Sequence, residues 1–343
     1  MTSGLTHMRR EIEEIPEATR RLLDGSAARF ADAGAALRRL DPVMIATIAR
    51  GSSDHATAFL KYAIEISAGI PVASIGPSIT SIYGRELRLK GCAALSITQS
   101  GGSPDIVAMT RSAKKTGALT IALTNTPDSP LGRAADVTID LLAGRELSVA
   151  ATKSFISSIV AGLAILANWT EDSALKNSLA ALPDVFAQSI AVDWSPLLGA
   201  LEGRSSLYVL GRGPAFAVAQ EAALKFKETG AVLAEAFSSA EVLHGPARIV
   251  EAGFPVLALA SRDAGEAGVA EIADGLAGQG AAVYATSSLV KKADRLPFVP
   301  AGHPLTDALS LAVSFYVFAE MYSRHRGFDP DRPPHLKKVT ETL

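Results

Sequence analysis

Apolar runs rich in strand-forming residues alternate along the chain with longer stretches in which apolar positions recur at helical spacing. Two of these runs, residues 43–49 and 207–210, are each followed by a glycine-containing loop and then by a helical pattern, which reaches Ile66 in the first case and Glu228 in the second. Alternation of this kind is typical of βαβ units, whose parallel strands form a sheet that helices cover on both faces. The pattern therefore predicts an α/β fold.

The same pattern recurs at a fixed distance along the chain. Arg50 and Arg212 follow the two runs above and lie 162 positions apart, and Gln99 and Ser261, which follow a later run in each half, are separated by the same 162 positions. A constant offset between separate features indicates an internal duplication. Because 343 residues also exceed one ordinary core, we expect two duplicated domains, each a parallel sheet flanked by helices.

Changes in the pattern set the expected domain boundaries. The segment from Leu179 to Pro196 has two prolines and no clean period, so we expect a connector there. The two longest apolar helical stretches, 155–167 and 308–321, contain serines and fall short of the ~18–20 residues needed to cross a bilayer, so we expect buried helices. The expected order is a helical arm at 1–25, a first domain at 26–180, a second domain at 197–326 and an irregular tail at 327–343.

Composition narrows the environment and the partners. The net charge is −2, without the basic excess that would neutralise a nucleic-acid backbone, so we expect no nucleic acid as a partner. Cys92 is the only cysteine, which fits a reducing compartment. Residues 1–21 alternate Arg and Glu without the apolar core of a signal peptide. We therefore expect a cytoplasmic protein that does not span a membrane.

A loop after the run Leu95–Ile97 has the character of a phosphate site. Hydroxyl and amide side chains crowd a glycine pair there, and Pro104 fits the first turn of a helix that runs to Lys115. The unpaired N–H groups of a helix N-terminus favour an anion, hydroxyls donate to phosphate oxygens, and glycines let the backbone approach closely. With a second loop contributing, the expected phosphate-binding residues are Ser52, Ser53, Thr98, Gln99, Ser100 and Ser103.

Other interpretations of this loop stay open at this point. A serine that caps a helix beside a glycine loop would look similar, and most α/β proteins contain one. Nucleotide binding is disfavoured, because no Walker lysine follows the glycines and no Gly-x-Gly-x-x-Gly occurs there.

Candidate acid–base groups lie in the second half. Glu221, Lys225 and Glu228 have the spacing of one helix face, which is also the spacing of an exposed ion-pair ladder. His244 lies in a His-Gly-Pro turn, where a structural hydrogen bond is the alternative to a proton-transfer role. The other histidines have no metal-ligand spacing, so we expect no metal and no cofactor.

Several motifs, taken in order, resemble the sugar isomerase (SIS) family, and specifically the isomerase half of glucosamine-6-phosphate synthase. Thr98–Asp105 matches the family's Ser-Gln-Ser-Gly-x-(Ser/Thr)-x-Asp loop with Thr in the first place. Gly51–Ser53 matches Gly-Thr-Ser, and Ala150–Lys153 matches Ala-Ser-Thr-Lys with Ala151 in place of Ser. The second half carries the remaining matches, which are Leu210–Gly213, Ala223–Glu228, Ala234–Ala236 and Glu241–Pro246.

This resemblance implies a fold and a set of roles. The implied fold is two flavodoxin-like SIS domains in a homodimer whose active sites lie at the subunit interface. Glu228 would move a proton between C1 and C2 of a sugar, Lys225 would orient the reacting oxygens, and His244 would open the ring in the neighbouring subunit's site. Val149 and Glu221 would join the substrate-binding residues. The family's tail lysine, which in the synthase forms a Schiff base with the ketose, corresponds to Lys338, with Lys337 as the alternative, so Lys338 is the fourth catalytic candidate.

The resemblance also implies a sugar-phosphate substrate and aldose–ketose chemistry. The synthase's glutaminase domain, which begins with a catalytic cysteine, has no counterpart in this sequence. We therefore expect a stand-alone glucosamine-6-phosphate deaminase. A phosphosugar isomerase, a deglycase and a transaminase-like isomerase remain alternatives, as does, from a different class, a non-catalytic sugar-phosphate sensor.

Overall fold

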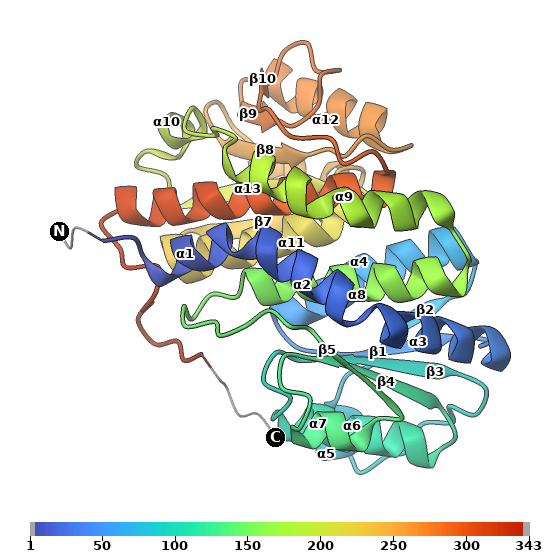
Figure 1. Ribbon diagram of the computed structural model, residues 1–343. Helices are drawn as coiled ribbons and strands as arrows, with labels where there is room; N and C mark the ends of the chain where they lie inside the picture. Colours follow the sequence, from blue (N-terminus) through green and yellow to red (C-terminus); the bar gives the residue numbers. More distant parts are fainter. Residues whose placement is uncertain (1–3, 339–343) are drawn as a thin grey trace. The chain divides into compact units, whose positions relative to one another are not determined.

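The computed structural model describes residues 4–338, and these form two compact units. The first unit comprises residues 17–146, 153–180 and 337–338, and the second comprises 4–16, 147–152 and 181–336. Figure 1 labels the helices and strands of both. Each unit contains one five-stranded sheet in which all strands run parallel, so the predicted pair of α/β domains is confirmed.

The sheet of the first unit has the strand order β2-β1-β3-β4-β5. Its faces are covered by α3, α4 and α8 on one side and by α5, α6 and α7 on the other, as Figure 1 shows. The strands are β1 (Ile45–Ile48), β2 (Val72–Ser74), β3 (Ala93–Ile97), β4 (Leu119–Thr124) and β5 (Val137–Asp140). The helices are α2 (Ile15–Gly25), α3 (Ala27–Leu40), α4 (Ser52–Ala68), α5 (Ser78–Ser81), α6 (Pro104–Lys115), α7 (Pro130–Ala134) and α8 (Lys153–Trp169).

Burial on both faces explains why the central strands β1, β3 and β4 of this unit consist mostly of apolar residues. Ala46 and Ile48 of β1 pack in one apolar cluster with Ile106 and Met109 of α6. On the opposite side α8 approaches α4 closely at Gly162, where an added Cβ would lie only 2.4 Å from the Leu60 side chain. A larger residue at this position would push the two helices apart.

The sheet of the second unit has the order β10-β9-β8-β6-β7. Helices α11 and α13 pack on each other through Phe226, whose ring meets those of Phe315, Phe318 and Tyr322, while α12 packs against β8 and β9. The strands are β6 (Ser206–Gly211), β7 (Leu233–Ser238), β8 (Pro255–Leu259), β9 (Ala282–Ala285) and β10 (Asp294–Arg295). The helices are α1 (His7–Glu13), α10 (Leu197–Leu201), α11 (Pro214–Gly230), α12 (Glu266–Gly278) and α13 (Pro304–His325), with short 3₁₀ turns at Glu241–His244 and Pro246–Ile249.

The two sheets share one topology, which confirms the duplication. Counted along each half, both have the order second-first-third-fourth-fifth, which is the flavodoxin-like arrangement. Gly51 precedes α4 with φ 57° and ψ −135°, and Gly213, 162 positions later, precedes α11 with φ 56° and ψ −133°. This conformation is open only to glycine, so the turn from the first strand into its helix is built identically in both halves.

The connector expected from Leu179 to Pro196 is wrong over most of its length. Helix α9 runs from Ser173 to Ile190 with Pro183 inside it. A proline in a helix interior costs about 3 kcal/mol. The helix nevertheless buries Leu175, Leu179, Leu182 and Phe186, each worth about 1.5–3 kcal/mol, so burial outweighs the cost.

The two long apolar helices are buried as expected, within α8 and α13. Among the helices of residues 4–338, none combines the length and the apolar character needed to cross a membrane. From Gly327 to Lys338 the tail contains neither helix nor strand, as its prolines indicated.

Candidate functional site

The predicted phosphate loop lies at the switch point of the first sheet. The strand order reverses between β1 and β3, and these neighbours pair in parallel with Ile48 opposite Ser96. Both strands therefore end at the same edge, which places Ser52 and Ser53 beside the loop that follows β3. Ligands of such sheets bind in the crevice outside the carboxyl ends of the strands at the point of reversal. The structure thus places next to each other the two loops that the sequence indicated separately as candidates for phosphate binding.

An ion pair between the half-exposed Arg50 and a buried carboxylate ties these two loops to each other. The side chain of Asp105, in the first turn of α6, is completely buried and accepts hydrogen bonds from Nε and Nη2 of Arg50 at 3.1 and 3.0 Å. Its other oxygen accepts the backbone N–H of Ile106. Removal of Arg50 would leave a buried carboxylate without its cation. The relative position of the two loops therefore depends on this pair.

Part of the loop after β3 is accessible to a ligand. Ser103 occupies the N-cap position of the 12-residue helix α6, yet its hydroxyl makes no capping bond, so the simple N-cap interpretation does not account for it. Gly101 has φ 64°, and an added Cβ would lie 1.9 Å from Oγ of Ser129. Glycine is thus required at Gly101 by both conformation and space. Thr98 is buried, whereas Gln99, Ser100 and Ser103 are partly exposed.

A polar cavity adjoins the phosphate loop within the first unit. It has a volume of about 450 Å³, and its lining includes Gln99, Asn125, Arg145 and Glu146. Glu146 also accepts the ammonium of Lys338 at 2.8 Å. Of the two lysines considered for the tail, Lys338 is therefore the one held beside this cavity, while Lys337 is exposed.

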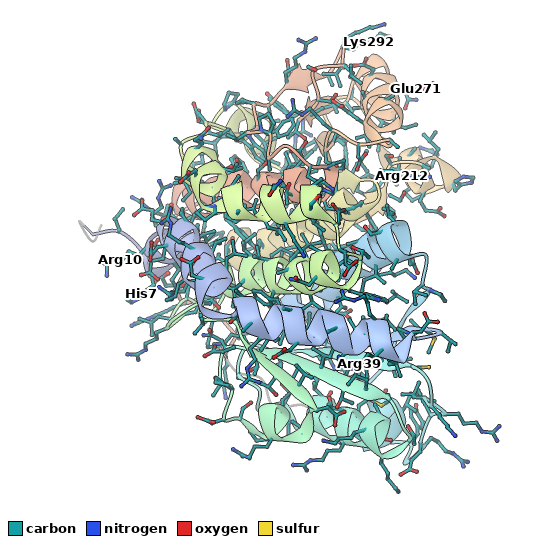
Figure 2. The ribbon with its side chains drawn as sticks, turned by 45° about the vertical axis from the view of Figure 1, so that its right-hand side comes forward. His7, Arg10, Arg39, Arg212, Glu271 and Lys292 are labelled. Carbon is teal, nitrogen blue, oxygen red and sulfur yellow. The ribbon has the colours of Figure 1, made fainter. Side chains whose placement is uncertain are left out.

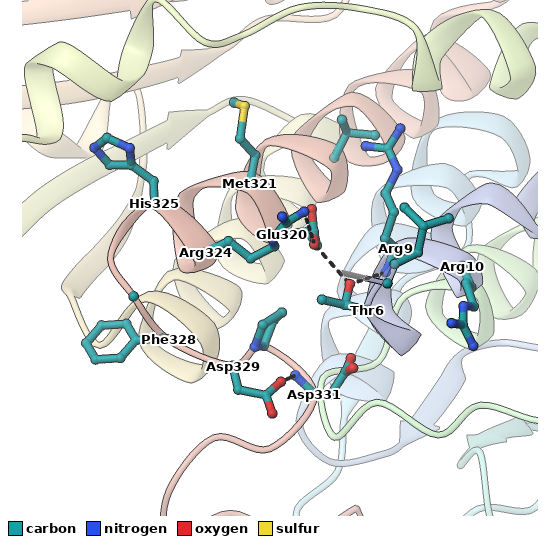
Figure 3. Close-up of a pocket in the computed structure, with 15 residues that line it drawn as sticks. Thr6, Arg9, Arg10, Glu320, Met321, Arg324, His325, Phe328, Asp329 and Asp331 are labelled. Atoms are coloured by element: carbon teal, nitrogen blue, oxygen red, sulfur yellow. Dashed lines mark hydrogen bonds and ion pairs between the residues drawn. The ribbon is translucent and has the colours of Figure 1, made fainter. Parts of the chain in front are cut away.

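Val149 belongs to a junction in the second unit that joins three parts of the chain. Its N–H donates to the carbonyl of Asp331 at 3.4 Å, which links the loop carrying Val149 to the tail. The carboxylate of Asp331 in turn accepts the N–H groups of His7 and Met8, each at 2.7 Å, and so caps the start of α1. Figure 3 shows Asp331 and Asp329 at one side of a cavity of about 980 Å³, opposite the end of α13.

The predicted stripe of Glu221, Lys225 and Glu228 lies on one face of α11, but it is not an exposed ladder. The side chain of Lys225 is 0% exposed and that of Glu221 is 1% exposed, while Glu228 remains 20% exposed. The ammonium of Lys225 lies 3.1 Å from Oε1 of Glu221 and 2.6 Å from Oε2 of Glu228. Tyr316 of α13 donates its hydroxyl to the same oxygen of Glu221 at 3.1 Å.

Charge balance explains how this cluster is tolerated. Burial alone would lower the pKa of Lys225, but the carboxylates of Glu221 and Glu228 outweigh burial and raise that pKa well above its ordinary value. Lys225 is therefore a fixed cation and not a proton donor near neutral pH. Glu228 is the only member with access to solvent, so it is the member that can exchange a proton with a ligand.

His244 ends the first 3₁₀ turn and lies at the surface. The next residue, Gly245, has φ 139° and separates this turn from the second 3₁₀ turn. Within residues 4–338, no group of three or more His, Cys, Asp or Glu side chains is arranged to hold a metal ion.

Sequence reasoning missed three residues that the structure places at these clusters. Tyr316 and Glu146 contact residues 95 and 192 positions away, respectively, so no local spacing connects them. In the sequence, Arg50 stood out only as one of the two positions that mark the internal repeat. A signal did exist for Glu146, which is a charged residue directly before an apolar segment that leads into a buried helix.

We expect Tyr316→Phe to lower the free energy of unfolding by about 1.5–3 kcal/mol, because the ionised Glu221 loses a buried donor. Tyr208→Phe in the same unit is the matched control, because that hydroxyl donates to the neutral carbonyl of Pro246 at 3.1 Å. Its expected cost is smaller, about 0.5–1.5 kcal/mol. Urea denaturation of both variants measures the difference, and equal losses would show that the charge of Glu221 adds nothing to the bond.

Comparison with known proteins identifies the family. The SIS domain model matches residues 42–167 and 200–290. Glutamine–fructose-6-phosphate aminotransferase [isomerizing] of Symbiobacterium thermophilum is 32% identical over 364 residues, covering 98% of this chain and 59% of that protein. The chain thus spans somewhat more than half the length of this relative.

Two solved structures extend the comparison. A Silicibacter pomeroyi protein provisionally named a phosphosugar isomerase is 55% identical with a TM-score of 0.93, covering 95% of this chain and all of that one. Glucosamine-6-phosphate deaminase from Thermotoga maritima is 19% identical with a TM-score of 0.78, covering 98% of this chain and 100% of that one, a likeness of fold alone. Since the family model matches more than half of the chain and does so in both duplicated halves, the protein belongs to the SIS domain family.

Proposed function

We propose that this protein performs aldose–ketose chemistry on a sugar phosphate, and specifically that it converts glucosamine-6-phosphate and water into fructose-6-phosphate and ammonia. The observation that carries the proposal is the state of Glu228. It is a carboxylate with partial access to solvent, held in place by a buried lysine that is itself fixed by a second carboxylate. A base that is held in position and partly desolvated suits the transfer of a proton between neighbouring carbons.

The steps follow from the chemistry of the substrate. In the open-chain sugar, Glu228 removes the proton from C2 and returns it to C1, while the C2 amine loses one N–H proton and O1 gains one. The aldehyde thereby becomes a hydroxymethyl group and the amine becomes a ketimine. Water then adds to C2 and ammonia leaves, so that fructose-6-phosphate remains. Lys225 holds Glu228 in position through the contact at 2.6 Å, and His244 opens the ring. Hydroxyls and amides of the phosphate loop hold the phosphate, so that remote binding energy positions the reacting carbons.

Names of related proteins support sugar-phosphate chemistry but differ over the reaction. The relative from Symbiobacterium thermophilum is named as an isomerizing aminotransferase that acts on fructose-6-phosphate, and the Silicibacter pomeroyi protein as a phosphosugar isomerase. An isomerase without deamination is therefore the second candidate. It would need the same proton transfer by Glu228, so the fate of the nitrogen distinguishes the two.

The proposal includes a homodimer in the cytoplasm. His244 is flanked in the sequence by two exposed apolar residues, Leu243 (54% exposed) and Ile249 (55% exposed). Exposed apolar groups beside a candidate catalytic residue fit burial against a second copy of the chain, where His244 would enter the partner's site. Cys92 is a buried free thiol, which fits a reducing compartment.

The test is incubation of the purified protein with glucosamine-6-phosphate while ammonia and fructose-6-phosphate are both measured. Equal, enzyme-dependent formation of both supports deamination. Interconversion of an aldose and a ketose phosphate without ammonia supports the isomerase. Binding of the sugar phosphate without any turnover contradicts both and favours a sensor.

Ser103→Ala is expected to weaken binding of fructose-6-phosphate about two- to tenfold, because one hydroxyl donor to the phosphate is lost. Stability should change little, since this hydroxyl makes no capping bond to α6. Ser112→Ala at the far end of the same helix is the matched control and should leave affinity unchanged. Calorimetric titration measures both variants, and unchanged affinity of Ser103→Ala would remove this residue from the phosphate site.

A further inference from the structure

The buried carboxylate of Glu146 is built to receive a cation. Its side chain is 0% exposed. Ser154 donates to it twice, from its backbone N–H at 3.1 Å and from its hydroxyl at 2.7 Å. The ammonium of Lys338 is a third donor, at 2.8 Å. Hydrogen bonds to an ionised group are among the stronger ones in proteins, so the three donors together stabilise the charged carboxylate.

This carboxylate is positioned by helix α8 independently of the tail. Ser154 is the second residue of α8, so its N–H is one of the unpaired donors at the positive end of the helix. The preceding residue, Lys153, is also buried and donates its ammonium to the carbonyl of Arg145 at 2.6 Å, which fixes the backbone next to Glu146. Contacts with residues close in sequence therefore fix the position of Glu146. Its partner Lys338, by contrast, lies 192 positions away in the sequence.

The tail that carries Lys338 is also held at a second point, earlier in the sequence. Asp331, seven residues earlier, caps α1 through two N–H groups. Between these contacts the chain has neither helix nor strand, so no regular hydrogen bonding fixes its path. The position of the lysine amine thus depends on the contact with Glu146.

We propose that Glu146 is a positioning residue that docks the tail by holding the ammonium of Lys338 at the cavity bordered by Gln99. The inference rests on the proposed function, since it assigns Lys338 to the site that binds the sugar phosphate. Gln99 of the phosphate loop and Glu146 line the same cavity. A sugar phosphate held by that loop therefore meets an amine whose place is set by Glu146, although Glu146 itself takes no part in the chemistry.

The first test measures docking without any substrate. The full chain is treated briefly with an amine-acetylating reagent, and modification of Lys338 is compared with that of the adjacent, exposed Lys337 by peptide mass spectrometry. We expect Lys338 to react more slowly than Lys337 in the wild type. Glu146→Gln should raise the reactivity of Lys338 about two- to fivefold, the range for a partly exposed ion pair, and leave Lys337 unchanged.

Two further variants separate docking from a general effect on the fold. Glu146→Asp keeps the charge and should restore part of the protection. Ser154→Ala removes one donor to Glu146 and leaves the charge in place, so Lys338 should stay protected. Equal reactivity of Lys338 in the wild type and in folded Glu146→Gln would overturn the proposal, as would loss of protection in Ser154→Ala alone.

A double-mutant cycle then tests the link to the reaction. If Glu146 acts through Lys338, Glu146→Gln lowers kcat in the wild type but has no further effect in the Lys338→Met background. Equal effects in both backgrounds would show a merely structural role and contradict the proposal. The tests can refute the two hypotheses independently. A wild type that releases no ammonia refutes the deaminase. Acetylation of Lys338 that is unchanged in Glu146→Gln refutes docking, whatever the reaction is.

Discussion

Glu228→Gln is expected to lower kcat by about 10²–10⁴-fold, the contribution of a well-placed general base. The amide has the size of the carboxylate and can still accept a hydrogen bond from Lys225, which lies 2.6 Å from Oε2 in the wild type. It cannot accept the C2 proton. Binding of fructose-6-phosphate should therefore survive while turnover is lost, which separates a catalytic role from a structural one.

Exchange of hydrogen with solvent provides the more direct readout for this variant. In deuterated water the wild type should place deuterium on C1 of fructose-6-phosphate, and Glu228→Gln should not. Glu271→Gln is the matched control, because Glu271 lies exposed on α12, as Figure 2 shows. A Glu228→Gln variant that binds the sugar phosphate and turns over at the wild-type rate would remove Glu228 from the mechanism.

The sequence could predict features that depend on a regular spacing of residues or on a characteristic order of neighbouring residues. Glu221, Lys225 and Glu228 share a helix face because 3.6 residues make a turn, and one helix carries all three. The phosphate loop follows from a strand, a glycine pair and a proline in that order within a few positions, and the structure forms β3 and the start of α6 there. The duplicated topology was visible because two glycine turns recur 162 positions apart.

What the sequence could not predict depends on contacts between distant residues. Spacing alone does not distinguish an exposed ladder from a buried cluster, and only the packing of α13 against α11, with Tyr316 on Glu221, makes the cluster a buried one. The carboxylate partner of Lys338 lies 192 positions away. Helix α9 was missed for another reason, because the local signal of Pro183 was overridden by the burial of apolar residues around it.

Lys225→Met is expected to have the largest effect on stability, a loss of about 3–5 kcal/mol in the free energy of unfolding. Methionine fills most of the space of the lysine stem. The variant nevertheless leaves Glu221 and Glu228 without the cation that lies 3.1 and 2.6 Å from them. Loss of the cation costs more free energy at Glu221 than at Glu228, because Glu221 is buried and water cannot screen its charge.

The pH dependence of this loss has a defined sign. The folded-state pKa of Lys225 is raised above its ordinary value of 10.5 by the two carboxylates, against the effect of burial. A raised lysine pKa contributes stability that is fully present below the unfolded value and is lost as pH rises through the folded value. The difference between wild type and Lys225→Met should therefore be constant from neutral pH up to about 10 and shrink only above it.

A double variant separates the missing cation from the missing side chain. Lys225→Met combined with Glu221→Gln removes one buried charge together with its partner, and such neutral replacements of buried ion pairs are often close to neutral in stability. We expect it to regain most of the stability that Lys225→Met loses, as measured by urea denaturation at pH 7. If the double variant were no more stable than the single one, the loss would come from packing around position 225. The two carboxylates would then not require a cation, and the charge of Lys225 would not be what positions the candidate base Glu228.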